Sequence, residues 1–239
     1  MAGTGITHVL FDFFGTLVDY VPGRAVAVPR SWAFVRSLGV DVDERVVVDL
    51  WSTQFACLES RSAASHREFS MSDVARGFLL DALGLEPNER QVSALVTTYM
   101  SEWNALVRYP NDTCPTITTL STQFRLAVVT NTHDVALVPA HLKAMGIADL
   151  IETVITSVEV GWRKPHPAIY SVALEHLGIN PRQAVFVGDT YESDFCGPQA
   201  EGIFAFLLDP GRRHHVPDAQ HLDSIAELPE RLAALQMRS

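Results

Sequence analysis

The carboxylate of Asp12, near the start of the sequence, stands where a nucleophile would be expected. An apolar run over residues 9–11 ends at Asp12, and Gly15 and Thr16 follow in a short turn. Backbone amides in such a turn can point at an anion, as they do at helix N-termini. We therefore expect Gly15 and Thr16 to bind an anionic substrate. An aspartate after a buried strand is often only a turn former, so the interpretation of Asp12 as a nucleophile depends on what other segments of the sequence contain.

Two further segments carry groups that suit phosphate. Thr130 and Asn131 follow a second apolar run, where a hydroxyl and the free N–H groups of a following helix could hold phosphate oxygens. Lys164 precedes Pro165 in a turn, and its ammonium group is a compact charge that can neutralise a phosphate. The only other lysine of the chain is Lys143, on an expected helix face. These residues predict a site for a phosphoryl group.

The fourth segment predicts a metal site. Asp189 ends an apolar strand, and Asp194 falls in the first turn of the helix expected to follow. Both offer hard oxygen ligands, and Mg²⁺ is usually bound by one or two carboxylates with retained waters. Each segment alone has an ordinary structural explanation, but the ordered set of four makes a shared site the better explanation.

The elements that must position these residues form an alternating pattern. From about residue 115 onward, short β-branched runs alternate with amphipathic segments, which is typical of βαβ units and a parallel sheet. We expect strands at 8–12, 126–130, 153–156, 184–187 and 203–208. Helices are expected near 134–145, 167–177 and 192–201, followed by Gly146, Gly178 and Gly202 at C-cap positions. The fold class is therefore α/β, with a doubly wound parallel sheet and all four segments at the carboxyl ends of strands.

Residues 20–110 have a different, helical periodicity. The expected helices are 26–38, 44–59, 72–83 and 88–107, with no alternation of the kind that strands show. This segment follows the first strand directly, so we interpret it as a helical insertion from which the chain returns to the sheet near 110–115. Residues 210–220 are expected to form an irregular loop before a last helix at 225–235.

Composition limits the partners. The chain has 239 residues, is 47% hydrophobic and has a formal net charge of −10, which argues against nucleic acid or an anionic membrane as partner. A small-molecule substrate is the remaining expectation, while the oligomeric state is not predicted. Cys57, Cys114 and Cys196 stand far apart, so neither a zinc site nor a disulfide framework is indicated. With neither a signal peptide nor a membrane-spanning run in the sequence, we expect a cytoplasmic protein.

Together, the four segments resemble those of the haloacid dehalogenase-like (HAD) hydrolase superfamily. The resemblance covers nearly the whole chain and implies a Rossmann-like core with a helical cap inserted after the first motif, the arrangement called C1. The core would be residues 1–19 plus 111–239, and the cap residues 20–110. In that family the cap decides the substrate. Its polar candidates here are Arg24, Arg36, Glu59, Arg61, His66, Arg67 and Glu68.

The resemblance also implies roles for individual residues. Asp12 would attack phosphorus and become an aspartyl-phosphate that water hydrolyses. Thr130 would hydrogen-bond the transferring group, and Lys164 would stabilise its charge and orient Asp12. Mg²⁺ would be held by Asp12, the backbone carbonyl of Phe14, Asp189 and Asp194.

Phe14 is the informative departure from the family pattern. HAD phosphatases carry at this position a second aspartate that acts as general acid and base, a role typically worth about 10²–10⁴-fold in rate. The 2-haloacid dehalogenases instead carry an aromatic residue there, and also an arginine after a Leu-Trp pair where this chain has Ser52. Their fourth motif lacks the Gly-Asp pair, which this chain keeps as Gly188 and Asp189. Phosphonoacetaldehyde hydrolases use a cap lysine, and no lysine precedes Lys143.

Three functions therefore stay open at this point. An Mg²⁺-dependent phosphohydrolase acting on a small phosphorylated metabolite is favoured by Asp189 and Asp194. A 2-haloacid dehalogenase-like hydrolase with an Asp12 ester intermediate is favoured by Phe14. A non-catalytic phosphate-binding relative is the third, in which Phe14 marks lost turnover.

Overall fold

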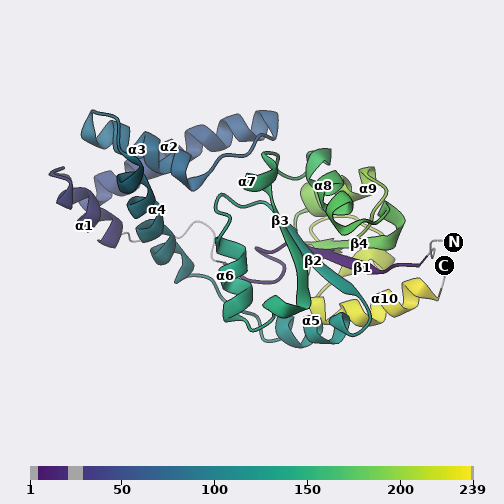
Figure 1. Cartoon of the computed structure of the whole chain (residues 1–239). Coiled ribbons are helices and arrows are strands. Elements are labelled where there is room, and N and C mark those ends of the chain that lie inside the picture. The colour runs from purple at the N-terminus through teal and green to yellow at the C-terminus, as the bar shows by residue number, and fades with distance from the viewer. Residues whose placement is uncertain (1–4, 21–28, 238–239) are drawn as a thin grey trace. The chain divides into compact units, whose positions relative to one another are not determined.

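The computed structural model of the protein describes residues 5–20 and 29–237. The chain divides into two compact units, one formed by Met1–Asp19 with Arg108–Ser239 and the other by Tyr20–Val107 (Figure 1). The second unit corresponds to the segment expected to form the helical cap, and its action as a cap remains a prediction. Arg24 lies outside the described residues, as do residues 26–28 of the first expected helix.

The first unit is built on a six-stranded parallel sheet in the order β3-β2-β1-β4-β5-β6. This order confirms the expected α/β, doubly wound fold, because the chain leaves β1 in one direction for β2 and β3 and in the other for β4 to β6. One strand was not predicted: β6 is two residues long, too short to show any alternation. The strands are β1 His8–Phe11, β2 Arg125–Thr130, β3 Ile151–Thr156, β4 Ala184–Gly188, β5 Phe204–Leu208 and β6 His221–Leu222.

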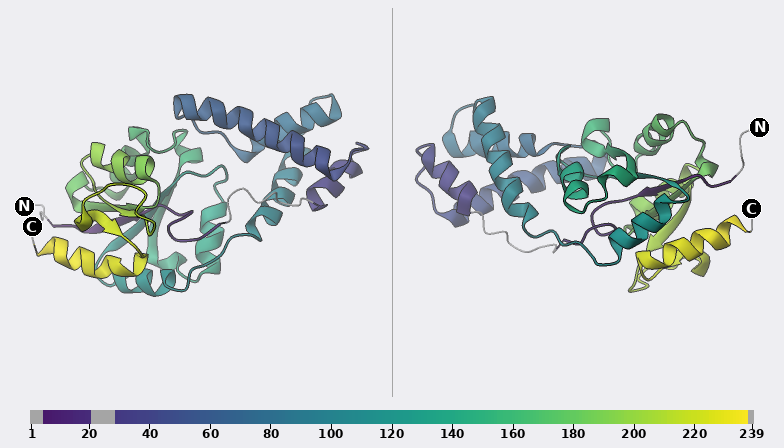
Figure 2. Two further views of the ribbon diagram at one scale, coloured as in Figure 1. Left: turned by 180° about the vertical axis from the view of Figure 1, so that it is seen from behind. Right: turned by 60° about the horizontal axis from the view of Figure 1, so that its bottom comes forward.

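Helices cover both faces of this sheet (Figure 2). One side carries α5 Thr113–Ser121 and α10 Leu228–Gln236, and the other carries α8 Pro167–Leu177. The central strand β1 is fully buried, which explains its continuous apolar sequence. The remaining helices of this unit are α6 Leu137–Ala144, α7 Ser157–Val160 and α9 Gly197–Ala200, with short 3-10 helices at Ala148–Leu150, Pro181–Gln183, Asp218–Gln220 and Ile225–Glu227.

Two expected helices of this unit differ most from the observed ones. The helix expected near 134–145 begins only at Leu137, because Asp134 accepts a hydrogen bond from the N–H of Ala136 and holds the preceding residues in a turn. The segment expected as one helix over 192–201 is a π-helix, Tyr191–Cys196, followed by the single turn α9. The short helices α5 and α7 were not predicted.

The second unit contains four helices in its described part: α1 Pro29–Ser37, α2 Glu44–Ser65, α3 Met71–Leu83 and α4 Glu89–Asn104. Capping boxes at Ser70 and Asn88 start α3 and α4, since each side chain accepts the third backbone N–H of its helix. Trp51 packs between Phe78 and Tyr99 in the core of this unit. Within the described residues of either unit, no helix is long and apolar enough to cross a membrane.

Candidate active site

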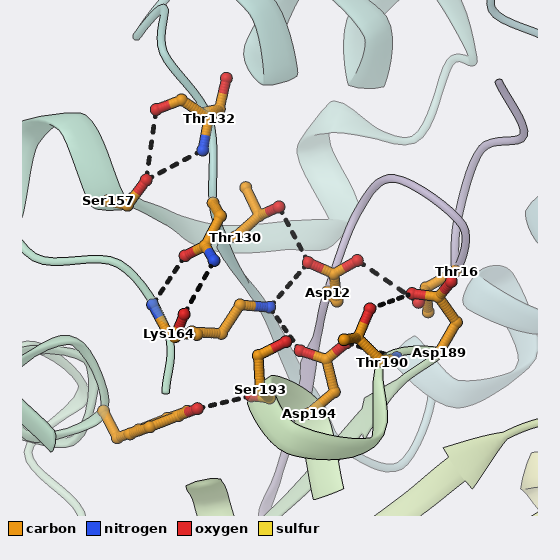
Figure 3. A network of polar contacts seen from close by, with 12 residues as sticks. Asp12, Thr16, Thr130, Thr132, Ser157, Lys164, Asp189, Thr190, Ser193 and Asp194 are labelled. Atoms are coloured by element: carbon orange, nitrogen blue, oxygen red, sulfur yellow. Dashed lines mark hydrogen bonds and ion pairs between the residues drawn. The ribbon is translucent and has the colours of Figure 1, made fainter. Parts of the chain in front are cut away.

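The carboxyl ends of β1, β2 and β4 and the loop between α7 and α8 bring the predicted catalytic and metal-binding residues together (Figure 3). Asp12 directly follows β1, and its backbone N–H donates to the carbonyl of Val187 on β4, 2.9 Å away. The Thr130 hydroxyl, at the end of β2, donates to Asp12 Oδ1 at 2.9 Å. The Thr16 hydroxyl lies 3.5 Å from Asp12 Oδ2, so it makes at most a weak hydrogen bond. The Asp12 Oδ1 atom is therefore held firmly, whereas Oδ2 is the less constrained oxygen.

Lys164 is the buried cation of this site. Its Nζ lies 2.7 Å from Asp12 Oδ1 and 2.6 Å from Asp194 Oδ1, and the side chain is almost completely buried. Burial alone would lower the pKa of Lys164, but the Asp12 and Asp194 carboxylates outweigh it and raise that pKa above its ordinary value. The ammonium group is therefore charged and forms an ion pair with Asp12.

Asn131 holds the backbone of Lys164. Its side-chain amide donates to the Lys164 carbonyl at 3.1 Å, and its Oδ1 atom accepts from the Lys164 N–H at 2.7 Å. The side chain of Asn131 is thus used within the protein, and the expected contact of the backbone N–H groups in this segment with phosphate stays a prediction. No local sequence signal could have revealed this pairing, because the two residues are 33 positions apart.

Three carboxylates surround the position expected for a metal ion. Asp12, Asp189 and Asp194 can each offer an oxygen such that the three atoms lie within 4.8 Å of one another. Burial and the nearby Asp12 charge raise the pKa of Asp189 to about 6. Burial, together with Asp12 and against the opposing effect of Lys164, raises the pKa of Asp194 to about 7. Three carboxylates and one lysine meet at this point, so the donor set fits a divalent cation.

The backbone of Gly15 lies close to the Asp189 carboxylate. The backbone of Gly15 has a φ of +90°, and a Cβ atom at this position would lie 2.4 Å from Asp189 Oδ2. A side chain at Gly15 would therefore displace one of the expected metal ligands. In the structure, Gly15 leaves space for the Asp189 carboxylate. The expected contact of Gly15 with the substrate stays a prediction.

Asp194 is held on its other side by Thr190. The Thr190 N–H donates to Asp194 Oδ2 at 3.0 Å, and the Asp194 N–H donates to the Thr190 carbonyl at 2.8 Å. Each Asp194 oxygen thus has a partner, Lys164 for one and Thr190 for the other. This arrangement suits a group that completes the coordination of a cation directly or through water.

Phe14 packs among other rings instead of presenting a proton donor. Its ring lies edge-on to Phe13 with centroids 5.0 Å apart, and edge-on to His141 at 6.3 Å. His141, which sequence reasoning did not single out, is paired through Nδ1 with the Tyr109 hydroxyl at 2.9 Å. Burial lowers the pKa of His141, which favours the neutral ring.

A cavity of about 440 Å³ opens beside Asp189 in the same unit. Its lining includes Asp19, Asp112, Asp189 and Asp223 but a single cation, Arg213. Arg213 is in turn paired with the buried Asp209 at 3.0 Å. Without a bound cation, the charge of this cavity disfavours an anionic group, although Gly15 and Thr16, the residues expected to bind an anionic substrate, also line it.

Comparison with known proteins places the chain in a family. The model of the haloacid dehalogenase-like hydrolase family matches residues 6–195, and a related HAD hydrolase-like model matches residues 161–233. The chain is 28% identical over 211 residues to a ribulose-1,5-bisphosphate 5-phosphatase of Halopiger xanaduensis, which covers 85% of each chain.

Two solved structures share the fold. A 2-haloacid dehalogenase from Pseudomonas syringae has a TM-score of 0.70 at 24% identity and covers 96% of this chain and 99% of its own. A HAD phosphatase from Thermococcus onnurineus has a TM-score of 0.66 at 24% identity, with 95% and 98% covered. The chain belongs to the haloacid dehalogenase-like hydrolase family and is a hydrolase.

Proposed function

We propose that this hydrolase is an Mg²⁺-dependent phosphohydrolase that acts on a small phosphorylated metabolite through an aspartyl-phosphate at Asp12. The observation that carries the proposal is the cluster of three carboxylates, two of them paired with Lys164, with Gly15 making room for the third, Asp189. A phosphatase among its relatives, similar over 85% of both chains, supports the same substrate class. The free thiols of Cys57, Cys114 and Cys196 agree with a cytoplasmic location.

Asp12, Asp189, Asp194 and the backbone carbonyl of Phe14 would hold the metal ion. Bound there, Mg²⁺ would supply positive charge that stabilises the oxygens of the transferring phosphoryl group. Lys164 would add a second positive charge on the other side of Asp12, which it already contacts. Thr130 would keep Asp12 Oδ1 in place while the phosphoryl group binds.

In the first step, Asp12 Oδ2 forms a bond to phosphorus as the ester bond between phosphorus and the leaving oxygen breaks. The leaving oxygen takes the electron pair of that bond and acquires a proton from water, since the Phe14 ring has none to give. In the second step, a water oxygen attacks phosphorus and gives a proton to the hydroxide left by the first step, while the bond between phosphorus and Asp12 breaks and its electron pair stays on Asp12 Oδ2. Inorganic phosphate leaves, and Asp12 returns to its carboxylate form.

A 2-haloacid dehalogenase activity is the second candidate, because Phe14 is aromatic and a dehalogenase shares the fold. In that reaction Asp12 would form an ester with carbon, and halide would leave without any need for a metal. The retained Asp189 argues against it, since a reaction without a metal gives this carboxylate no role. A non-catalytic phosphate-binding relative would keep the charged groups but show no turnover.

The test is a hydrolysis screen of acyl, aryl and alkyl phosphates beside 2-chloropropionate, with and without Mg²⁺. We expect phosphate release that requires Mg²⁺ and is lost in Asp12→Asn. Asp149→Asn serves as the control, because it removes an exposed aspartate of the same unit away from the site. Halide release that continues in the presence of a chelator would support the dehalogenase instead. No turnover of any substrate, with saturable phosphate binding, would support the non-catalytic relative.

A single turnover in ¹⁸O-water separates the two enzymes by the atom that water attacks. A phosphohydrolase attacked at phosphorus places the label in the released phosphate. A dehalogenase ester is cleaved at the carboxyl carbon, so the label enters the Asp12 side chain. Label in Asp12 would therefore overturn the proposed phosphohydrolase.

A further inference from the structure

We propose that Tyr170 is a positioning residue that fixes Asp194 through a hydrogen bond to the backbone carbonyl of Ser193. The inference rests on the proposed function, since Asp194 is one of the expected metal ligands. Tyr170 lies on α8, within the hydrophobic core, and is fully buried. Its hydroxyl donates to the backbone of Ser193, so its effect would come through the turn that carries Asp194.

The carbonyl of Ser193 lacks the partner that the helix would ordinarily supply. In the π-helix Tyr191–Cys196, the N–H of Gly197 donates to the carbonyl of Glu192, five residues earlier. The next bond in this pattern would join the nitrogen of residue 198 to the Ser193 carbonyl. Residue 198 is proline, which has no N–H group to donate. A buried carbonyl without a hydrogen bond is unfavourable, so another donor is needed.

Tyr170 supplies that donor. Its hydroxyl lies 2.5 Å from the Ser193 carbonyl oxygen. The approach depends on Gly197, because a Cβ atom there would lie 2.2 Å from the Tyr170 hydroxyl oxygen. The sequence Gly197-Pro198 therefore does two things: Pro198 leaves the carbonyl without a helical donor, and Gly197 leaves space for the tyrosine hydroxyl to reach it.

The bond acts directly on the peptide group that precedes Asp194. Ser193 and Asp194 are adjacent on the turn, and the Asp194 side chain points toward Lys164 (Figure 3). Asp194 is also packed closely beneath β4, since a Cβ on Gly188 would lie 2.4 Å from its Cβ. With so little space, a rotation of the peptide group between residues 193 and 194 would shift the carboxylate. Loss of the Tyr170 bond would permit that rotation and weaken the metal site.

The test compares Tyr170→Phe with the unmodified chain. This change removes the hydroxyl and keeps the ring in the core. By calorimetry, we expect Mg²⁺ to bind about 10-fold more weakly, the lower end of what loss of a group supporting a metal ligand costs. Phosphatase activity should fall at limiting Mg²⁺ and recover at saturating Mg²⁺. Tyr99→Phe, which alters a half-buried tyrosine of the helical unit, should leave Mg²⁺ affinity unchanged.

Restoring a helical donor should rescue the variant. The double variant Tyr170→Phe with Pro198→Ala offers a backbone N–H at residue 198 to the Ser193 carbonyl. We expect it to regain most of the lost Mg²⁺ affinity, which a tyrosine needed only for packing would not predict. Pro198→Ala alone should bind Mg²⁺ like the unmodified chain. If Tyr170→Phe does not fold, the double variant compared with Pro198→Ala tests the same point.

Amide hydrogen exchange in metal-free protein gives a readout that does not depend on the proposed function. Exchange in the segment 191–196 should be about 10-fold faster in Tyr170→Phe and return toward normal in the double variant. Unchanged exchange and unchanged Mg²⁺ affinity in Tyr170→Phe would overturn this inference while leaving the phosphohydrolase proposal intact. Absence of Mg²⁺ binding by the unmodified chain, with faster exchange in Tyr170→Phe, would overturn the proposed function and leave the positioning of Asp194 in place.

Discussion

Replacing Gly15 with alanine should weaken Mg²⁺ binding by displacing Asp189. The new Cβ would stand 2.4 Å from Asp189 Oδ2, whereas a normal contact needs roughly 3.5 Å. The carboxylate or the turn must therefore move by about 1 Å. Displacing a metal ligand on this scale is expected to cost about 10–100-fold in affinity, or roughly 1.4–2.7 kcal/mol. Activity should fall at least as much, because phosphoryl transfer depends on positioning.

Backbone strain is a separate effect that needs its own control. Alanine at a φ of +90° costs about 1–2 kcal/mol of folding stability whatever surrounds it. Gly39 has nearly the same φ, +88°, but a Cβ there would meet nothing within 4 Å. Gly39→Ala therefore reproduces the strain without touching Asp189.

The assay is calorimetric titration of both variants with Mg²⁺, beside thermal unfolding of the metal-free proteins. We expect similar losses of stability in Gly15→Ala and Gly39→Ala, and weaker Mg²⁺ binding only in Gly15→Ala. Equal Mg²⁺ affinity in the two variants would refute the assignment of Asp189 as a ligand that Gly15 accommodates.

Three further predictions follow from the same site. Lys164→Met should lower kcat/KM by at least about 10²-fold and destabilise the fold in urea, whereas Lys143→Met, at the other and exposed lysine, should change neither. Between pH 3.8, the ordinary Asp pKa, and about pH 6, the pKa of Asp189 in the folded protein, the folded state binds more protons than the unfolded state. The stability of the metal-free protein should therefore fall as pH rises through this range, and the stabilisation by Mg²⁺ should grow. An increase in melting temperature on adding Mg²⁺ that does not vary with pH would contradict this prediction. Phe14→Asp should raise alkyl phosphate turnover by part of the roughly 10²–10⁴-fold that a positioned acid supplies, and the native protein should depend steeply on leaving-group pKa.

The sequence predicted the features that depend on local patterns. Buried parallel strands have continuous apolar runs, so the five longer strands and the residues at their ends were found. The positions of Asp12, Thr130 and Asp189 at one edge of the sheet then follow from parallel topology. The π-helix was not predicted, because the residue types over Tyr191–Cys196 do not distinguish a π-helix from an α-helix.

Contacts between distant residues could not be predicted. The pairing of Asn131 with the backbone of Lys164 joins two loops that are adjacent only in the folded protein. The same is true of Gly15 and Asp189, which lie close together only in the folded protein. From the sequence alone, Gly15 is explained as a turn residue, and its role in leaving space for Asp189 is not visible. Sequence patterns indicate which elements form, while the detailed role of a side chain depends on what the other elements bring to it.

Phe14 favours a dehalogenase, whereas Asp189 favours a metal-dependent phosphohydrolase. The two residues differ in how much each would destabilise the protein if it had no function. A phenylalanine in place of an acid removes a proton donor but leaves no buried charge, and its ring finds partners in Phe13 and His141. Asp189, by contrast, places a negative charge in a partly buried site. Burial and the Asp12 charge raise its pKa more than Lys164 lowers it, so its ionised form is disfavoured at this site until a further cation binds. An enzyme with no use for a metal would gain stability at neutral pH by losing this half-buried carboxylate, whose ionised form is disfavoured there. Its presence beside Asp12 and Asp194 is therefore a stronger argument for metal-dependent phosphoryl transfer than Phe14 is against it.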